Sequence, residues 1–316
     1  WVAQSLVETI TEDDVFRQTE AFVVTAVDLS NPEDPAVIGQ DSLAAQDHAY
    51  FSYGRSDLGG ALLPDGSLLW YPARTASRFY FGAYRGLLID DAIMPYYPGA
   101  DRAYTVDITD QAAPRILASS ELRESDRHWN EGRTTLVGST LLFGLQNTAQ
   151  VPLPDGTSEW RTHHWLKQID LSDPAHPASR ELVSLPGTLE HAFPTSSGGL
   201  VLFSSTTRSF RADEIWTSEY KLQALAFDGM TAFLLDELVV PGPAYGPKVF
   251  EDDMAVMART EYQDGGAESA VSIYQWLPDG TIGLKRSLQH PAAVYELHIE
   301  DELLIAREPE ALTFID

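Results

Sequence analysis

The chain has 316 residues, with 47 Asp and Glu against 21 Lys and Arg, and its formal net charge at pH 7 is -26. Nucleic-acid phosphates and anionic membrane surfaces are bound through clustered Lys and Arg, so this charge excludes nucleic acid as a partner. Hydrophobic residues make up 44% of the chain, which excludes a disordered protein, and the absence of cysteine excludes thiolate nucleophiles, Cys-bound zinc and disulfides. No run of about 18 apolar residues occurs, so the sequence predicts no membrane insertion.

A turn pattern occurs three times along the chain, at residues 27–35, 106–114 and 169–177. In each copy an Asp follows a β-rich segment, a Ser or Thr comes two residues later, and a proline closes the turn. Short side chains with oxygen atoms satisfy the amides of a turn, and proline cannot continue a β-ladder. The repeated unit is therefore predicted to be a strand, a turn and a further strand.

A second repeat consists of short apolar segments, most of them preceded by turn residues. They lie at 87–89, 141–143, 200–203, 254–257 and 303–305. Together the two repeats give about four strands in every 50 residues or so, which is typical of a β-propeller. A β-sandwich would have as many turns, but it would not repeat the same turn chemistry three times. We therefore predict an all-β fold, a β-propeller with helices limited to single turns in loops.

The predicted propeller is a single domain, residues 1–316, of about six four-stranded blades, with five or seven as alternatives. The hairpin at 61–70 is either an insertion or half a blade. Residues 311–316 have the form of the third strand of a blade, so we expect Leu6–Ile10 to supply the outer strand and to close the ring. The alternative is that the chain is a fragment of a longer propeller.

The turns resemble those of the LVIVD-type repeats in bacterial secreted β-propeller proteins. The resemblance is carried by Asp-Leu-Ser-Asp-Pro at 170–174, which is followed by Pro177, and by its two counterparts. It implies a β-propeller that is exported or surface-linked and that acts as a binding or scaffold protein. The turns at 227–229 and 278–280 depart from the pattern, because Asp-Gly replaces the proline-bounded turn there.

Histidines are the first candidates for chemistry, because inward-facing His residues from several blades hold iron, copper or zinc in some propellers, such as those that resemble carotenoid oxygenases. Aligning the hairpins does not place the histidines at equivalent positions, so a symmetric ring is not supported. If a transition metal is bound, the expected ligands are His128, His163, His164 and His191. The structural alternative is that these are loop or surface histidines with ordinary partners.

Aromatic residues gather in the same part of the chain. The candidates for stacking on a sugar or on a partner chain are Trp129, Trp160, Trp165 and Trp216. The structural alternative is that they pack between blades. Carboxylates are abundant and could hold a calcium ion together with backbone carbonyls, although no segment matches the calcium loop of an EF-hand.

The sequence contains no nucleophile elbow, P-loop or HExxH motif, so no motif assigns a catalytic activity. Two functional hypotheses remain open. The first is a non-catalytic, extracytoplasmic propeller that binds a protein or glycan partner through its loop faces, as a scaffold or as a subunit of a surface assembly. The second is a metal-dependent propeller enzyme or metal-binding protein that uses the histidines of region 128–191. The acidity of the chain and the resemblance favour a periplasmic or cell-surface location.

Overall fold

The structure is a computed structural model that describes residues 2–12, 15–44, 57–74, 102–110, 112–122, 129–212, 215–240, 248–263, 266–300, 303–307 and 311–315. Within these ranges every regular element is a β-strand. No helix in the described part of the chain is long and apolar enough to span a membrane. The predicted all-β fold class is confirmed.

The chain divides into two compact units, which are described in turn. Unit 1 comprises Trp1–Thr162 and Leu166–Leu182, and unit 2 comprises His163–Trp165 and Val183–Asp316. The single-domain organisation of residues 1–316 stays a prediction.

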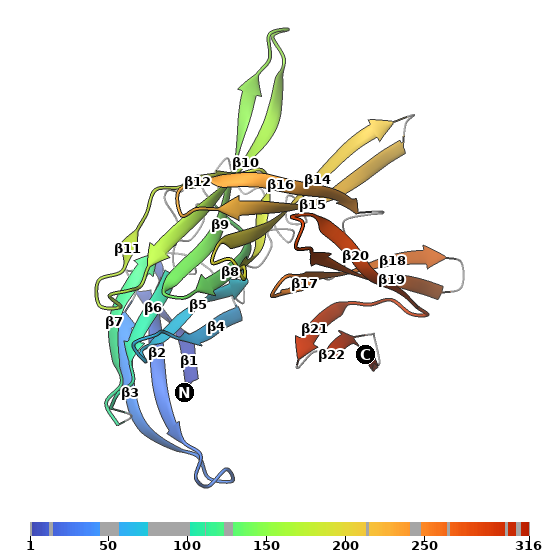
Figure 1. The fold of residues 1–316 in the computed structure, drawn as a ribbon. Coiled ribbons are helices and arrows are strands. Elements are labelled where there is room, and N and C mark those ends of the chain that lie inside the picture. The colour runs from blue at the N-terminus through green and yellow to red at the C-terminus, as the bar shows by residue number, and fades with distance from the viewer. Residues whose placement is uncertain are drawn as a thin grey trace. The chain divides into compact units, whose positions relative to one another are not determined.

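Unit 1 contains three antiparallel meanders, which we call blades A, B and C (Figure 1). Blade A consists of β1 (Val2–Glu12), β2 (Val15–Asp28) and β3 (Ala36–Ala44). Blade B consists of β4 (Asp57–Leu62), β5 (Leu68–Arg74), β6 (Arg102–Asp107) and β7 (Arg115–Glu121). Blade C consists of β8 (Trp129–Val137), β9 (Thr140–Pro152), β10 (Ser158–Asp170) and β11 (Ala178–Ser179).

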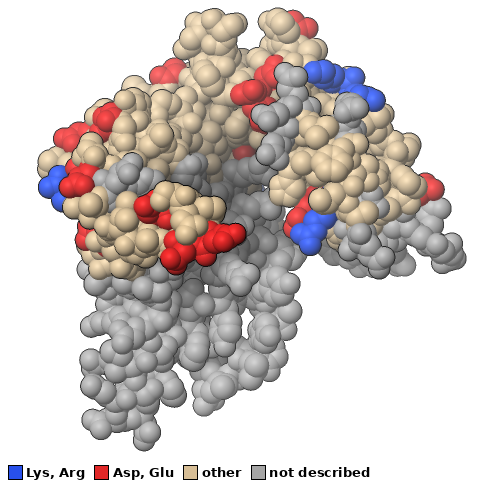
Figure 2. Space-filling model, turned by 90° about the horizontal axis from the view of Figure 1, so that it is seen from below, with Lys and Arg blue, Asp and Glu red and all other residues tan. Residues whose placement is uncertain are grey.

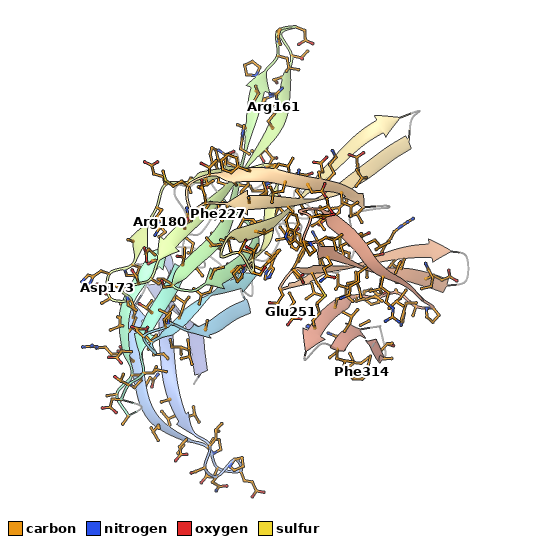
Figure 3. The ribbon with its side chains drawn as sticks, in the orientation of Figure 1. Arg161, Asp173, Arg180, Phe227, Glu251 and Phe314 are labelled. Carbon is orange, nitrogen blue, oxygen red and sulfur yellow. The ribbon has the colours of Figure 1, made fainter. Side chains whose placement is uncertain are left out.

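Unit 2 contains blades D, E and F and the short strand β12 (Val183–Leu185). Blade D consists of β13 (Thr188–Pro194), β14 (Leu200–Ala212), β15 (Ile215–Phe227) and β16 (Ala232–Val240). Blade E consists of β17 (Lys248–Glu251), β18 (Met254–Gln263), β19 (Gly266–Trp276) and β20 (Ile282–His290). Blade F consists of β21 (Glu296–Glu300), β22 (Leu303–Arg307) and β23 (Leu312–Ile315), which carries the exposed Phe314 (Figure 3).

Each blade is a meander in which consecutive strands pair antiparallel, and the blades follow one another along the chain. One pairing, between Arg74 of β5 and Arg133 of β8, joins blades B and C. Successive four-stranded antiparallel meanders are the arrangement of a β-propeller, so the predicted fold is confirmed. In the described residues blades B to E have four strands each, and blades A and F have three. The prediction of about six blades, with five as an alternative, is compatible with these sheets.

Aspartate side chains shape the turn between the last two strands of blades A to E. Asp28, Asp107 and Asp170 each accept a hydrogen bond from the backbone N–H two residues later, at 2.8 to 3.0 Å. Asp228 and Asp279 accept the equivalent bond in blades D and E, although their turns lack the proline pattern. Hydrogen bonds from neighbouring backbone and hydroxyl groups hold the pKa of each of these carboxyls below its usual range. Asp65 and Asp155 accept the same bond in the turns at 63–67 and 153–157, so this Asp bond is a general feature of the turns in the described chain.

A β-bulge accompanies this turn in four blades of the described chain. The register between the last two strands shifts at Ala26/Val27, Thr105/Val106, Ala224/Leu225 and Ile273/Tyr274. The shift leaves one extra residue on the outer strand, which is Ile38, Leu117, Leu235 or Lys285. A bulge increases strand twist and disrupts the free edge of a sheet.

The turn and the bulge fix the place of each strand in its blade. In blade A both lie between β2 and β3, so β1 is equivalent to the second strand of a complete blade. β1 pairs with β2 over its length, with Leu6 opposite Ala21 and Ile10 opposite Arg17. The prediction that Leu6–Ile10 forms the outer strand of the last blade is therefore wrong. The physical reason is that β1 and β2 are adjacent in sequence, and local pairing costs little loop entropy.

Two other local predictions are confirmed. The hairpin at 61–70 supplies parts of β4 and β5, which pair with each other as the first half of blade B. Residues 312–315 form β23, which pairs with β22 as the third strand of blade F. The apolar segments at 141–143, 200–203, 254–257 and 303–305 lie in second strands of their blades, and the segment at 87–89 lies outside the described residues.

Carboxylates also join neighbouring blades within each unit. The N–H of Ile116 in blade B donates to Asp41 Oδ2 of blade A at 2.7 Å. The N–H of Ile282 in blade E donates to Asp236 Oδ2 of blade D at the same distance. Each bond satisfies a backbone amide at the start of an outer strand, so it ties the outer strands of adjacent blades together.

Candidate functional site

The predicted metal-binding histidines are placed separately along the described strands. His163 and His164 are consecutive residues of β10, so their side chains point to opposite faces of the strand. The exposed His163 ring is stacked near Trp165, with centroids 6.4 Å apart. The half-buried His164 has Nδ1 3.4 Å from Thr188 Oγ1, and burial, followed by the neighbouring His163, lowers the pKa of His164.

His191 has an aromatic environment, and His128 lies outside the described residues. The His191 ring is stacked near Phe193 and Phe250, with centroids 6.2 and 6.5 Å away. Within the described part of the chain, no three His, Asp or Glu side chains are grouped as metal ligands would be. The metal site at His128, His163, His164 and His191 stays a prediction, and so does a calcium ion.

The tryptophans predicted to bind a ligand all lie on strands. Trp129 begins β8, Trp160 lies in β10 and Trp216 lies in β15, and the structure does not describe their side chains. Trp165 is half-buried, and its buried Nε1 has no hydrogen-bond partner among the described residues. Ligand binding by these residues stays a prediction.

A buried polar cluster between blades D and E was missed by the sequence reasoning. Its members are Glu190 on β13, Ser205 on β14, Tyr220 on β15 and Lys248 on β17, and we call them the Glu190 cluster. Pairing between β13 and β14 passes from Leu189 directly to His191, so Glu190 is the extra residue of a β-bulge. A bulge re-aims a side chain, and here it accompanies a carboxylate that is only 6% exposed.

The four side chains of the Glu190 cluster bind one another. Lys248 Nζ donates to Glu190 Oε1 at 2.7 Å and to the Tyr220 hydroxyl oxygen at 3.2 Å. The Ser205 hydroxyl donates to the same carboxylate oxygen of Glu190. Lys248 Nζ also lies 4.8 Å from the centroid of the Tyr220 ring, within the range of a cation–π interaction.

The charge states of the Glu190 cluster follow from burial and from the ion pair. Burial raises the pKa of Tyr220 to about 12, and the negative charge of Glu190 adds to this effect. For Lys248 burial acts to lower the pKa, but attraction to Glu190 and Tyr220 outweighs it, and the pKa is raised. Lysine nucleophiles require a lowered pKa, so Lys248 is unsuited to form a covalent adduct at neutral pH.

Apolar packing surrounds the Glu190 cluster. The rings of Phe203 and Phe250 are 6.0 Å apart, Phe193 lies 5.2 Å from Phe203, and all three belong to one core between blades D and E. The Glu190 side chain is 8% exposed and that of Lys248 is 27% exposed. The cluster therefore contains acid–base groups, and among the Glu190–Lys248 pair the Lys248 side chain is the more exposed to solvent.

A second polar row crosses blade D. Ser204, Gln223 and Glu237 lie opposite one another on β14, β15 and β16. Ser204 Oγ donates to Gln223 Oε1 at 3.1 Å, and Gln223 Nε2 donates to Glu237 Oε2 at 2.9 Å. Lys221 Nζ donates to Glu237 Oε1 at 2.6 Å, and this bond is the main cause that raises the pKa of Lys221 and lowers that of Glu237. The row ties the outer strand to the core of the blade.

Blade D exposes apolar side chains on and just before its outer strand. We call Met230, Phe233, Leu234, Leu235 and Val239 the β16 strip, and their exposed fractions are 83%, 54%, 53%, 46% and 52%. Leu235 is the extra residue of the bulge, and β16 is the edge of its sheet within the described chain. An edge position and a bulge together bring consecutive side chains to the surface.

Acidic groups accompany the β16 strip. Asp228, Asp236, Glu219 and Glu237 lie on or beside it, and Lys221 contacts both of these glutamates. Among these residues carboxylates outnumber ammonium groups. Figure 2 shows Asp and Glu at several places on the described part of one face of the molecule.

The chain was also compared with known proteins. No protein-family model and no curated protein matches it.

Proposed function

We propose that this protein is a non-catalytic β-propeller scaffold that binds a partner protein. The observation that carries the proposal is the β16 strip, where Phe233, Leu234 and Leu235 are consecutive and each is about half exposed. Phe233 and Leu234 face opposite sides of the sheet, and exposed apolar side chains along a sheet edge mark interaction sites. Burying a Leu or Phe side chain contributes about 1.5 to 3 kcal/mol, so this strip provides enough apolar surface for binding.

The state of the Glu190 cluster favours a scaffold over an enzyme. Its carboxylate is held by Lys248 and Ser205, and its phenol accepts a bond from Lys248. Ser205 is 5% exposed and Tyr220 is 3% exposed, which leaves little access for a substrate. Buried networks in which each member has a partner rigidify a structure, and a rigid interface between blades suits a binding platform.

An extracytoplasmic location is part of the proposal. It is supported by the net charge of -26 and by the resemblance of the turns to LVIVD-type repeats. Cell fractionation with an antibody against the protein tests the location, and a cytoplasmic pool alone would contradict it.

The binding function is tested by affinity capture from a cell-envelope extract of the source organism. We expect the immobilised protein to retain one or a few proteins in near-stoichiometric amounts, identified by mass spectrometry. An immobilised acidic protein of similar charge is the control for non-specific retention. Binding to a glycan array without retention of any protein would contradict the choice of a protein partner, and retention of nothing on either would contradict the scaffold.

A further inference from the structure

We propose that the chain cleaves its own backbone between Asp173 and Pro174, with the Asp173 carboxylate as the nucleophile and His176 as the proton donor. This activity goes beyond the proposed scaffold function and does not depend on it, because the substrate is the protein itself. The bond lies in the turn between β10 and β11 of blade C, where Figure 3 labels Asp173. The products are one chain that ends at Asp173 and one that begins at Pro174.

The turn surrounds both the main-chain carbonyl and the side chain of Asp173 with polar groups. The N–H of His176 donates to the main-chain oxygen of Asp173 at 3.0 Å, so it polarises the carbonyl that is attacked. His176 Nδ1 lies 3.0 Å from Asp173 Oδ2, and the N–H of Ala175 donates to Oδ1 at 3.1 Å. One four-residue turn therefore holds the nucleophile, the carbonyl and the proton donor in fixed positions.

The leaving side of the bond is held from blade B. The Thr105 hydroxyl donates to the carbonyl oxygen of Pro174 at 2.6 Å, and Pro174 is buried. The side chains of Asp173 and His176 are 64% and 83% exposed, so water reaches both reacting groups. The leaving residue is thus fixed, while the water that completes the hydrolysis has free access.

The cleavage balances with water as the only co-reactant. A carboxylate oxygen of Asp173 attacks the main-chain carbonyl carbon of the same residue, and a five-membered cyclic anhydride forms as the C–N bond to Pro174 breaks. The departing nitrogen takes a proton from protonated His176 and leaves as a secondary amine. Water then opens the anhydride to two carboxylates, one on the side chain and one at the new C-terminus. Of the two protons released, one returns to His176 and the other goes to solvent.

The repeat supplies two natural comparisons for this turn. Asn31 in blade A and Asp110 in blade B hold the equivalent position, and the main-chain oxygen of each accepts the N–H three residues later at 3.1 Å. Each side chain also accepts the N–H two residues later. Blade A lacks the carboxylate, and blade B lacks the proline and has Ala113 in place of His176. The fold of the turn therefore does not require the Asp-Pro-Ala-His sequence of blade C.

The charges around the turn favour cleavage in mildly acidic solution. The hydrogen bond with His176 is the main cause that holds the pKa of Asp173 below its usual range. The nucleophile therefore stays ionised at about pH 5 to 6, where histidine side chains in general carry a proton. The strands around the turn also carry the buried Lys167 and two ion pairs, Asp170 with Arg180 and Asp107 with Arg115.

The test compares two Asp-Pro bonds of the full chain. Asp34–Pro35 is the internal control, because Val37 stands where the histidine stands at the other bond. The purified protein is incubated with protease inhibitors at about pH 5.5, and fragments are identified by mass spectrometry and N-terminal sequencing. We expect a new N-terminus at Pro174 that forms about tenfold or more faster than the one at Pro35. In guanidinium the two bonds should be cleaved at similar rates, because the turn is lost.

Two variants assign the roles, and each introduces a residue that another blade has at the same position. Asp173→Asn, as in blade A, keeps a side chain that can accept the turn bond but removes the nucleophile, so cleavage at Pro174 should stop. His176→Ala, as in blade B, should slow cleavage by about tenfold or more, and added imidazole should restore part of the rate. Asp34→Asn is the matched control and should leave cleavage at Pro174 unchanged. Circular dichroism shows whether each variant is folded.

Each contrary result overturns a defined step. Equal rates at the two Asp-Pro bonds of the folded protein would show ordinary acid hydrolysis and refute a self-cleaving turn. Cleavage that persists in folded Asp173→Asn would refute the nucleophile, and an unchanged rate in His176→Ala would refute the proton donor. A rate constant that rises with protein concentration would refute an intramolecular reaction. Intact protein after prolonged incubation would overturn the proposal as a whole and leave the scaffold function as it stands.

Discussion

Replacing Lys248 by Met tests the assignment of charge in the Glu190 cluster. The substitution keeps most of the volume of the side chain and removes the ammonium that lies 2.7 Å from Glu190 Oε1. Removing one partner of a buried ion pair costs about 3 to 5 kcal/mol, because the other charge is left without compensation. Lys248 is 27% exposed and Ser205 still donates to Glu190, so water and the hydroxyl reduce the loss. We expect Lys248→Met to lower the free energy of unfolding by about 2 kcal/mol.

A double-mutant cycle isolates the interaction. Glu190→Gln combined with Lys248→Met removes both charges, and we expect this pair to be within about 1 kcal/mol of the wild type, with a coupling energy of about 2 kcal/mol. Lys221→Met is the control, because Lys221 and Glu237 form an ion pair whose side chains are about 30% exposed. It should cost less than Lys248→Met, because exposed ion pairs contribute little to stability.

The assay is urea unfolding followed by tryptophan fluorescence, repeated at alkaline pH. Because the folded-state pKa of Lys248 is raised, its contribution is complete below the unfolded value of about 10.4 and is lost as pH rises through the folded value. The advantage of the wild type over Lys248→Met should therefore shrink in that alkaline range. A loss no larger than that of Lys221→Met, or a coupling energy below about 0.5 kcal/mol, would refute the reasoning.

Three further predictions concern stability. Hydrogen bonds from the Ser172 backbone and from Arg180 lower the pKa of Asp170 to about 2, so Asp170→Asn should cost about 1 kcal/mol at neutral pH. This contribution to stability is present above the unfolded pKa of about 3.9 and is lost as pH falls toward 2. Equal unfolding midpoints of the wild type and Asp170→Asn at neutral pH would contradict the prediction. A Cβ on Gly187 would clash with the backbone oxygen of Ser205, so Gly187→Ala should cost about 3 kcal/mol. Gly198→Ala should cost less, about 1 kcal/mol, because only the φ of +83° opposes it. Asp236→Ala removes the acceptor of a blade-linking amide and should cost about 2 kcal/mol in thermal unfolding, and a change below about 0.5 kcal/mol would show that the bond is dispensable.

Local chemistry explains which parts of the fold could be predicted from the sequence. Asp28, Asp107 and Asp170 shape turns with groups two residues away, so their pattern is visible in a short window. Asp228 and Asp279 make the same bond outside the proline-bounded pattern, and an Asp followed by Gly was the signal available there. The N-terminal strand was misplaced because a strand pattern alone does not specify which neighbour it pairs with.

The Glu190 cluster could not be predicted because its contacts are remote in sequence. Glu190 is 15 residues from Ser205 and 58 residues from Lys248, and Lys248 is 28 residues from Tyr220. The bulge at Glu190 has no sequence signature of its own. The one available signal was a glutamate within the apolar segment 188–194. The candidate metal ligands, by contrast, attracted attention through residue type alone, and His163, His164 and His191 contact hydroxyl and aromatic groups.

The most direct test of the central claim is photocrosslinking from the β16 strip in cells of the source organism. A benzophenone amino acid replaces Met230, which is 83% exposed, or Asp155 in an exposed turn of unit 1 as the control. We predict a discrete protein adduct from position 230 that is absent from position 155. No adduct from position 230, or the same adducts from both positions, would contradict a binding surface on blade D.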